Sequence, residues 1–407
     1  MVEVRNYNAA GDGMTNDTAA VQQALDSGEV VHFSPGTYLC GTLYLRSNGG
    51  IHLAEGATLL AIPGKENYNA DDFSSRNLIF SHEHTSGAHF IIAEDCANVS
   101  ITGKGTISGN YLSVFDTSHV EAVFRPHYSY PPWRMAQMIF LVGCQNVKIN
   151  GITMKDPQYW TCFLLDCEEV HIADIKLRAD RRVLNADGLD IDCCRHVLIE
   201  NCDIDCGDDC IAIRANETHA GRHAPCQDVV VRNCLLSSPA CGVRIGVGNG
   251  KLKNTVLRDL KIKNSAIGIG LCPSYTREKC VEISDICIEN IAFEGEQAFI
   301  ITPEWGFLNM IEDAPAIKPL RNIIFRNFQA ESTKGSLLIF PVKKELYSGI
   351  SLENVHIHLK EPSSPFLPHR WAHKEYGVLN ILRGSELDLE GFTGTAAGDH
   401  PIVLHSC

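Results

Sequence analysis

Three aspartates on two short stretches of the chain have the residue type and spacing for chemistry. Asp187 lies in Asn185–Gly188, and Asp208 and Asp209 lie in Cys206–Cys210. The residues between the two stretches alternate apolar and polar, which is typical of a strand. A separation of 21 or 22 residues is close to one turn of a stacked β-coil, so we expect the three carboxyls to share one face. Clustered acids can supply the proton donor and the base that hydrolysis of a glycosidic bond requires.

Short strands of one type recur along the chain and must position these acids. Each is rich in β-branched residues and alternates apolar with polar, the pattern of a half-buried strand. One copy cannot bury its own apolar face, so the copies must stack. Helical patterns between them are absent, which disfavours βαβ units and leucine-rich repeats. We predict a single-stranded, right-handed parallel β-helix, an all-β fold, from copies at 98–103, 146–151, 169–173, 196–201, 228–233, 254–258, 281–284, 322–327 and 349–354.

The ends and excursions of this β-helix also have sequence signals. Ala20, Val21, Ala24 and Leu25 fall on one helical face, so a capping helix is predicted over about 16–26. The aromatic and proline-bearing segment 110–134 is predicted to be a loop over a coil, and 361–376 a second excursion. No low-complexity linker interrupts the chain, so one β-helix domain is predicted over 1–407.

Charge and cysteine content restrict the partners and the location. The sequence has 49 acidic and 35 basic residues, a net charge of -14, which argues against nucleic-acid or anionic-membrane partners. No apolar run is long enough to span a membrane, and the first residues contain no apolar signal core. The 17 cysteines are spread through apparent strands, which favours buried thiols in a reducing compartment. We therefore expect a cytoplasmic protein, or a secreted one if a leader precedes this sequence. The oligomeric state is not predicted.

The acid-bearing blocks resemble the polygalacturonase family of glycoside hydrolases, in the pectin-lyase-like β-helix superfamily. Gly207–Arg214 is similar to the family's Gly-Asp-Asp-Cys block, and Asn185–Gly188 to its Asn-Thr-Asp-Gly, with Ala for Thr. The stretches 10–13 and 17–22 resemble the superfamily's usual N-terminus, and the resemblance covers about residues 6–355. It implies an inverting hydrolase without a cofactor. Asp208 would be the general acid, while Asp187 and Asp209 hold and activate water. Inverting carboxyls usually lie roughly 6.5–9.5 Å apart.

Two departures from the family pattern bear on the substrate. Cys241 stands where the family has the His of Gly-His-Gly, and it is interpreted as a small buried residue rather than a nucleophile. Gly270 and Cys272 stand where the family has Arg-x-Lys, which grips substrate carboxylates. The acids are retained while this grip is missing, so the identity of the sugar stays open.

Several other residues are candidates for substrate binding. Arg244 and Arg214 can offer a planar fork of donors to a carboxylate or a hydroxyl, although either can instead be a solvated strand residue paired with an acid. Histidines of the loop after the acid pair lack a third convergent ligand, so no metal site is predicted. The tryptophans best placed to stack on sugar rings are those in loop-like surroundings. The remaining substrate-binding candidates are Asn185, His223, Trp133 and Trp305.

The sequence supports one leading function and three alternatives. The leading hypothesis is an inverting, polygalacturonase-like hydrolase of pectin-derived or related oligosaccharides, acting from the chain end. The first alternative is a glycosidase for a neutral sugar or another uronide, motivated by the missing grip. The second is a polysaccharide lyase, in which these acids would bind Ca²⁺. The third is a glycan-binding β-helix without catalysis.

Overall fold

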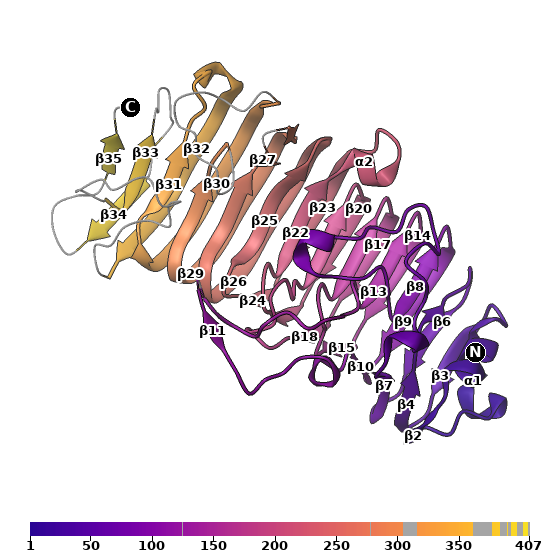
Figure 1. Ribbon diagram of the computed structural model, residues 1–407. Helices are drawn as coiled ribbons and strands as arrows, with labels where there is room; N and C mark the ends of the chain where they lie inside the picture. Colours follow the sequence, from indigo (N-terminus) through magenta and orange to yellow (C-terminus); the bar gives the residue numbers. More distant parts are fainter. Residues whose placement is uncertain are drawn as a thin grey trace. The chain divides into compact units, whose positions relative to one another are not determined.

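The computed structural model describes residues 1–123, 125–276, 278–303, 316–360, 377–382, 389, 392–396 and 402–405. The chain divides into two compact units, unit 1 over Met1–Asp209 and unit 2 over Cys210–Cys407. Each unit is a stack of parallel strands wound as a β-helix, and strands far outnumber helices (Figure 1). The predicted parallel β-helix is confirmed.

In unit 1 each full coil contributes a strand to each of three parallel stacks. The stack nearest the acids contains β5 (Leu43–Tyr44), β8 (Ile91–Glu94), β13 (Ile139–Val142), β16 (Cys162–Leu165) and β19 (Leu189–Asp192). The second contains β1 (Val2–Glu3), β3 (Val30–Phe33), β6 (Gly50–Leu53), β9 (Ala97–Gly103), β14 (Gln145–Asn150), β17 (Glu168–Ala173) and β20 (Arg195–Glu200). The third contains β2 (Asp12–Asn16), β4 (Gly36–Cys40), β7 (Ala57–Ala61), β10 (Thr106–Ser108), β15 (Thr153–Lys155), β18 (Lys176–Arg178) and β21 (Asp203–Asp205).

In unit 2 four long strands pair in parallel along most of their length. They are β26 (Lys251–Cys272), β29 (Glu282–Ile301), β30 (Leu320–Lys334) and β32 (Tyr347–Leu359). The shorter parallel strands are β22 (Ile211–Ala215), β23 (Cys226–Arg232), β24 (Leu235–Ser237), β25 (Cys241–Gly248), β31 (Ser336–Ile339), β33 (Leu379–Leu382), β34 (Phe392–Ala396) and β35 (Ile402–His405). Two small antiparallel pairs are β11 (Glu121–Ala122) with β12 (Pro126–His127), and β27 (Ser274–Thr276) with β28 (Lys279–Cys280).

Asparagines at the corners explain why the coils repeat in register. Asn98 and Asn146 have φ of 58° and 54°, in the left-handed region that Asn tolerates better than most residues. The Asn146 amide nitrogen donates to Asn98 Oδ1 at 2.7 Å. In unit 2 the same corner conformation recurs at Asn254, Asp285 and Asn322, with φ of 52°, 58° and 56°. The copy predicted at 281–284 was therefore wrong in register, since the equivalent corner lies at Asp285.

The predicted N-terminal cap is α1 (Thr18–Leu25), which buries Val21, Ala24 and Leu25. Asp17 precedes it, and its carboxylate accepts backbone hydrogen bonds from Ala10 at 2.7 Å and Gly11 at 2.9 Å. The other helices are α2 (Glu217–Ala220) and the 3₁₀ turns η1 (Val4–Tyr7), η2 (Lys65–Asn67), η3 (Ser81–Glu83), η4 (Tyr111–Ser113) and η5 (Lys344–Leu346). Among the described residues no helix has the length and apolarity to cross a membrane. The predicted excursion 361–376 lies outside the described residues.

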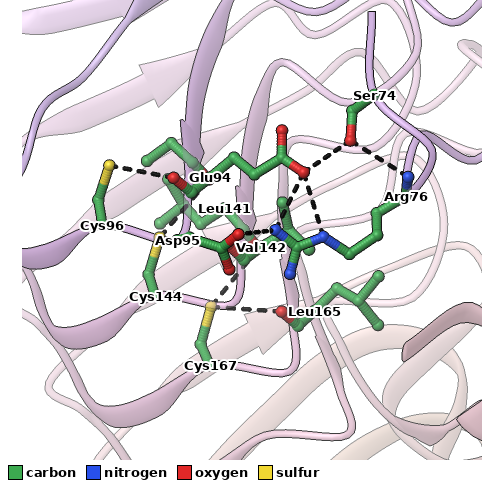
Figure 2. A network of polar contacts seen from close by, with 11 residues as sticks. Ser74, Arg76, Glu94, Asp95, Cys96, Leu141, Val142, Cys144, Leu165 and Cys167 are labelled. Carbon is green, nitrogen blue, oxygen red and sulfur yellow. Dashed lines mark hydrogen bonds and ion pairs between the residues drawn. The ribbon is translucent and has the colours of Figure 1, made fainter. Parts of the chain in front are cut away.

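A column of cysteine thiols fills one corner of unit 1 (Figure 2). Cys144 donates from Sγ to the carbonyls of Ala93, one coil earlier, and Val142, both at 3.5 Å. Cys96, Cys167 and Cys194 repeat this pattern on their own coils. The weak S–H donors add a second hydrogen bond to corner carbonyls such as that of Val142, which also accepts from the Asp95 N–H at 2.9 Å. All the cysteines among the described residues are thiols, and all but Cys287 are buried, as predicted.

Candidate active site

The three predicted acids lie together on neighbouring coils. Asp187 precedes β19 by two residues, and its neighbour Gly188 donates a backbone hydrogen bond of 2.9 Å to the Asp209 carbonyl. Gly207 donates back to the Ala186 carbonyl at 2.9 Å. The two acid-bearing turns are thus joined as adjacent rungs. One carboxylate oxygen from each of Asp187, Asp208 and Asp209 lies within 4.8 Å of the others.

The distance of 4.8 Å joins single oxygens, whereas the roughly 6.5–9.5 Å usual for an inverting pair separates whole carboxyl groups. The approach of the three oxygens shows that the acids cluster, as expected. The inverting separation of the carboxyl groups stays a prediction.

Asp187 is the acid whose surroundings favour a proton. Its residue is 5% exposed, and its Oδ1 has no hydrogen-bond partner among the residues that the structure describes. Burial, followed by the charges of Asp190, Asp208 and Asp209, raises the pKa of the Asp187 carboxyl well above its ordinary value. The surroundings of Asp187 therefore favour the protonated form of its carboxyl.

Asp208 has a cation beside it that the sequence analysis did not identify. Arg125 Nη2 lies 2.6 Å from Asp208 Oδ2, and the two side chains are 15% and 19% exposed. Burial acts to lower the pKa of Arg125, but the charge of Asp208, then of Asp187 and Asp209, outweighs it and raises that pKa. A charge-assisted pair of this kind favours the ionised form of Asp208.

The segment that carries Arg125 is fastened to the coil bearing Asp187. Arg125 lies in the turn between β11 and β12, and Tyr128 N donates to the Arg182 carbonyl at 2.9 Å. The hydroxyls of Tyr111 and Tyr128 donate to Asp180 Oδ2 at 3.0 and 3.2 Å. An apolar cluster completes the attachment, formed by Phe115, Tyr128, Val183 and Ala186 with Tyr111, Val114 and Ala179 packed against it. The predicted loop over a coil is thus an anchored strap, residues 110–134 as far as described.

The strap ends at a second arginine, Arg134, which is fully buried. Its guanidinium donates to backbone carbonyls, including Leu184 at 2.8 Å and Glu83 at 2.6 Å. It also lies against the rings of Tyr130 and Tyr159, at 5.1 and 4.9 Å from their centroids. Arg134 therefore joins the strap to the turn just before Asp187, and its charge acts on the Asp187 carboxyl.

Four other residues were predicted to bind substrate. Asn185 is half-buried in the turn before Asp187, with φ of 58°. Trp133 packs on Tyr68 with ring centroids 5.5 Å apart. The His223 side chain is 97% exposed and pairs with Glu217 at 2.8 Å. Trp305 lies outside the described residues. Of these four, the structure brings only Asn185 into an acid-bearing turn.

The predicted basic residues and the departures from the family pattern lie in unit 2. Arg244 on β25 is in register with Ala212 on β22 and with Gly270 on β26. Arg214 follows Ala212 by two residues, so alternation places both arginines on the same outward face of these strands. Cys241 is fully buried in an apolar cluster, as predicted, and Cys272 is also fully buried. Neither Gly270 nor Cys272 offers a cation.

A groove of about 500 Å³ lies elsewhere in unit 2, on the strands β26, β29, β30, β32 and β34. Its polar lining includes Lys261, Lys263, Glu331, His356 and His358. None of the three acids lines this groove, so it is separate from the acid cluster.

Comparison with known proteins also points to a glycoside hydrolase. Residues 64–366 match the glycosyl hydrolases family 28, and residues 1–54 match the rhamnogalacturonase A/epimerase, pectate lyase-like family. A probable polygalacturonase of Vitis vinifera is 25% identical over 379 residues, covering 87% of this chain and 73% of that protein. An exopolygalacturonase of Cochliobolus carbonum is 22% identical, covering 80% of each. The solved exopolygalacturonase of Thermotoga maritima is 20% identical, with a TM-score of 0.73 over 96% of this chain and 92% of that one.

Proposed function

The chain belongs to glycosyl hydrolases family 28 and is a polygalacturonase-type glycoside hydrolase, and on that premise we propose that it cleaves uronic-acid-containing, pectin-derived oligosaccharides from the chain end with inversion. The observation that carries this proposal is the approach of Asp187, Asp208 and Asp209 to within 4.8 Å. Three acids at this distance can hold one proton for the leaving oxygen and still keep two carboxylate groups for water.

The proposed roles follow from where the proton must be during the reaction. Asp208 donates the proton to the glycosidic oxygen as the bond breaks. Asp187 and Asp209 orient a water molecule and accept its proton as the water attacks the opposite face of the sugar. These assignments rest on the family resemblance and on the clustering of the acids.

Exo-action has support from the strap and from the names of several relatives. The strap covers the coils that bear the acids in unit 1, so it can limit access for a long polymer. Relatives in Cochliobolus carbonum and Dickeya chrysanthemi are an exopolygalacturonase and an exo-poly-alpha-D-galacturonosidase. A solved relative of different specificity is an endo-xylogalacturonan hydrolase of Aspergillus tubingensis, 18% identical with a TM-score of 0.67 over 96% of this chain and 98% of that one. A related uronide is therefore the second candidate substrate.

A substrate panel tests the proposed function. Wild type and Asp209→Asn are assayed for reducing ends on galacturonate oligosaccharides, polygalacturonate and neutral xylo-oligosaccharides, and the products are sized. We expect monosaccharide release from the oligosaccharides, little activity on the polymer and none on the neutral chains. A ladder of early products would contradict exo-action. An ultraviolet-absorbing unsaturated product that depends on calcium would establish the lyase alternative.

Arg244 enters this proposal as a substrate-binding residue of unit 2. Arg244→Ala should raise KM on the best oligosaccharide by roughly 10-fold, the loss expected when one charge-assisted bond is removed. Arg258→Ala, which removes an arginine paired with Asp259, is the matched control and should leave KM unchanged. An unchanged KM in Arg244→Ala would remove Arg244 from the site.

A further inference from the structure

We propose, on the basis of the proposed function, that Arg125 recognises the substrate's uronate carboxylate, and that its transfer from Asp208 to that carboxylate releases Asp208 to act as the general acid. Arg125 is thus both a specificity-determining residue and the element that couples substrate recognition to proton placement. The geometry behind this proposal is the contact of Arg125 with Asp208 and the clustering of the three acids.

The ion pair creates a conflict that substrate binding can resolve. Asp208 must carry a proton to donate it, yet the guanidinium of Arg125 at 2.6 Å favours its carboxylate form. A second carboxylate from the substrate can take over the guanidinium, because Arg presents several N–H donors in a fixed fork. Both side chains keep some exposure, 15% and 19%, so an incoming anion can reach the pair.

Because the strap is anchored on both sides of Arg125, the Arg125 side chain can change its partner from Asp208 to the substrate without movement of the strap backbone. Tyr128 on the C-terminal side of Arg125 is held by Asp180 and by the Arg182 carbonyl, while Phe115 on the other side is buried in the apolar cluster. His127 Nδ1 also lies 2.8 Å from the Arg125 carbonyl. The backbone at Arg125 is therefore fixed, and only the end of its side chain has to reorient.

Asp187 can supply the proton that Asp208 needs. An oxygen of Asp187 lies within 4.8 Å of one of Asp208, and the burial of Asp187 favours its protonated form. When Arg125 turns to the substrate, the proton passes from Asp187 to Asp208, directly or through a water. Asp187 becomes a carboxylate, as required to activate water with Asp209. The number of protons in the cluster is unchanged, and one then leaves Asp208 for the glycosidic oxygen.

Other charged groups near the pair are consistent with this exchange. Tyr130 lies within reach of the charges of Arg134, Glu83, Asp208 and Arg125, and burial raises the pKa of its hydroxyl, so that it stays neutral. Arg134 is committed to backbone carbonyls. In unit 2, Gly270 and Cys272 provide no cation where the family has its carboxylate grip. Arg125 pairs directly with one of the acids, and it is therefore the basic side chain to which we assign the substrate's carboxylate.

The exchange predicts discrimination against neutral sugars. A neutral glycan of the same shape offers no anion to Arg125, so Asp208 stays paired and ionised, and the acid step fails. Selectivity for uronides over neutral analogues then depends on Arg125 itself.

Arg125→Gln, Arg125→Lys and the control Arg178→Gln test this inference. Arg178 is also paired with an aspartate of unit 1, Asp203, but lies on β18, away from the acids. For Arg125→Gln we expect kcat/KM on a galacturonate oligosaccharide to fall about 10²-fold, because the charge-assisted contact to the substrate's carboxylate is lost from the complex. Arg125→Lys should recover part of the loss, and Arg178→Gln should match wild type.

The pH profile separates this role from a structural one. Removing the cation raises the pKa of the neighbouring acids, so the acid limb of kcat/KM should move to higher pH in Arg125→Gln and move less in Arg125→Lys. A folded Arg125→Gln enzyme with an unmoved acid limb and an unchanged preference for uronide over neutral oligosaccharide overturns the inference. If wild type cleaves no uronide, the proposed function itself fails, which is a different result. If Arg125→Gln does not fold, the same two measurements on Arg125→Lys decide.

Discussion

The hydroxyl of Tyr128 donates a hydrogen bond of 3.2 Å to Asp180 Oδ2, and the same oxygen accepts one of 3.0 Å from Tyr111. One carboxylate thereby holds two points of the strap, on either side of Arg125 in the chain. Asp180 in turn is paired with Arg182 at 2.6 Å. The position of the cation beside Asp208 thus depends on an acid that takes no part in the chemistry.

Asp180→Asn should weaken both the strap and catalysis. Burial acts to raise the pKa of Asp180, but hydrogen bonds from Arg182 and Tyr111 outweigh it and lower that pKa to about 2. Its folded pKa lies below its ordinary value of 3.8, so it contributes stability above pH 3.8 that is lost as the pH falls towards 2. The variant should therefore unfold at lower temperature than wild type at pH 7, with the deficit shrinking in acid.

The same variant should lose roughly 10-fold in kcat/KM on the best oligosaccharide, since the loss of about 1.4 kcal/mol of positioning corresponds to that factor. Asp116→Asn is the control, because Asp116 also lies in the strap but accepts its hydrogen bonds from Ser118, two residues away, and not from the groups that anchor the strap. Equal activity of Asp180→Asn and wild type would show that the strap does not position the site.

Asp187→Asn should stabilise the protein at neutral pH, whereas Asp180→Asn should destabilise it. The pKa of Asp187 is raised in the folded protein, so ionisation of this carboxyl opposes folding. Its contribution to stability is therefore greatest below the ordinary pKa of 3.8 and is lost as the pH rises towards the folded pKa. The neutral Asn side chain avoids that cost. The melting temperature of Asp187→Asn should exceed that of wild type at pH 7 and approach it near pH 3.5. A variant less stable than wild type at neutral pH would contradict the buried proton.

Each acid of the cluster should be needed for turnover. Asp208→Asn and Asp209→Asn keep the shape of the side chain but cannot donate or accept the proton, so kcat should fall on the order of 10²-fold or more. Asp203→Asn, which changes an acid of β21 paired with Arg178, is the matched control and should keep wild-type turnover. Full activity of Asp208→Asn on the best substrate would refute its assignment.

The first product should have the inverted anomeric configuration. Two acids can hold a water molecule on one side of the sugar while the third protonates the leaving oxygen, so no covalent glycosyl-enzyme is needed. Proton NMR of the product formed within the first minutes, before mutarotation, reads the configuration directly. A retained anomer, or an adduct trapped on one of the aspartates, is the outcome that this mechanism forbids.

The sequence was sufficient for the acids because their proximity depends on the length of a coil. Asp187 and Asp208 are brought together by one turn of a repeating strand pattern, which alternation and spacing reveal. The pairing of Arg125 with Asp208 spans 83 residues and has no period. It depends on how an irregular strap folds back, and the only signal in the sequence was a basic residue among the aromatic and proline residues of 110–134.

One repeat copy was also misplaced. The copy predicted at 281–284 misses the corner at Asp285 because β29 runs through its corners without a break, so alternation alone does not mark them. Trp133 packs on Tyr68, and its contact with a sugar ring stays a prediction.

The thiol column of unit 1 has a consequence for how such a protein can change over generations. Each coil brings its own cysteine, and that thiol serves a carbonyl of its own coil and one of the coil before it. Insertion or deletion of a whole coil therefore leaves no orphaned half of a cross-link, as it would in a scaffold stitched by disulfides. The stack can therefore lengthen by duplication of a coil, or shorten by loss of one, without breaking a covalent cross-link.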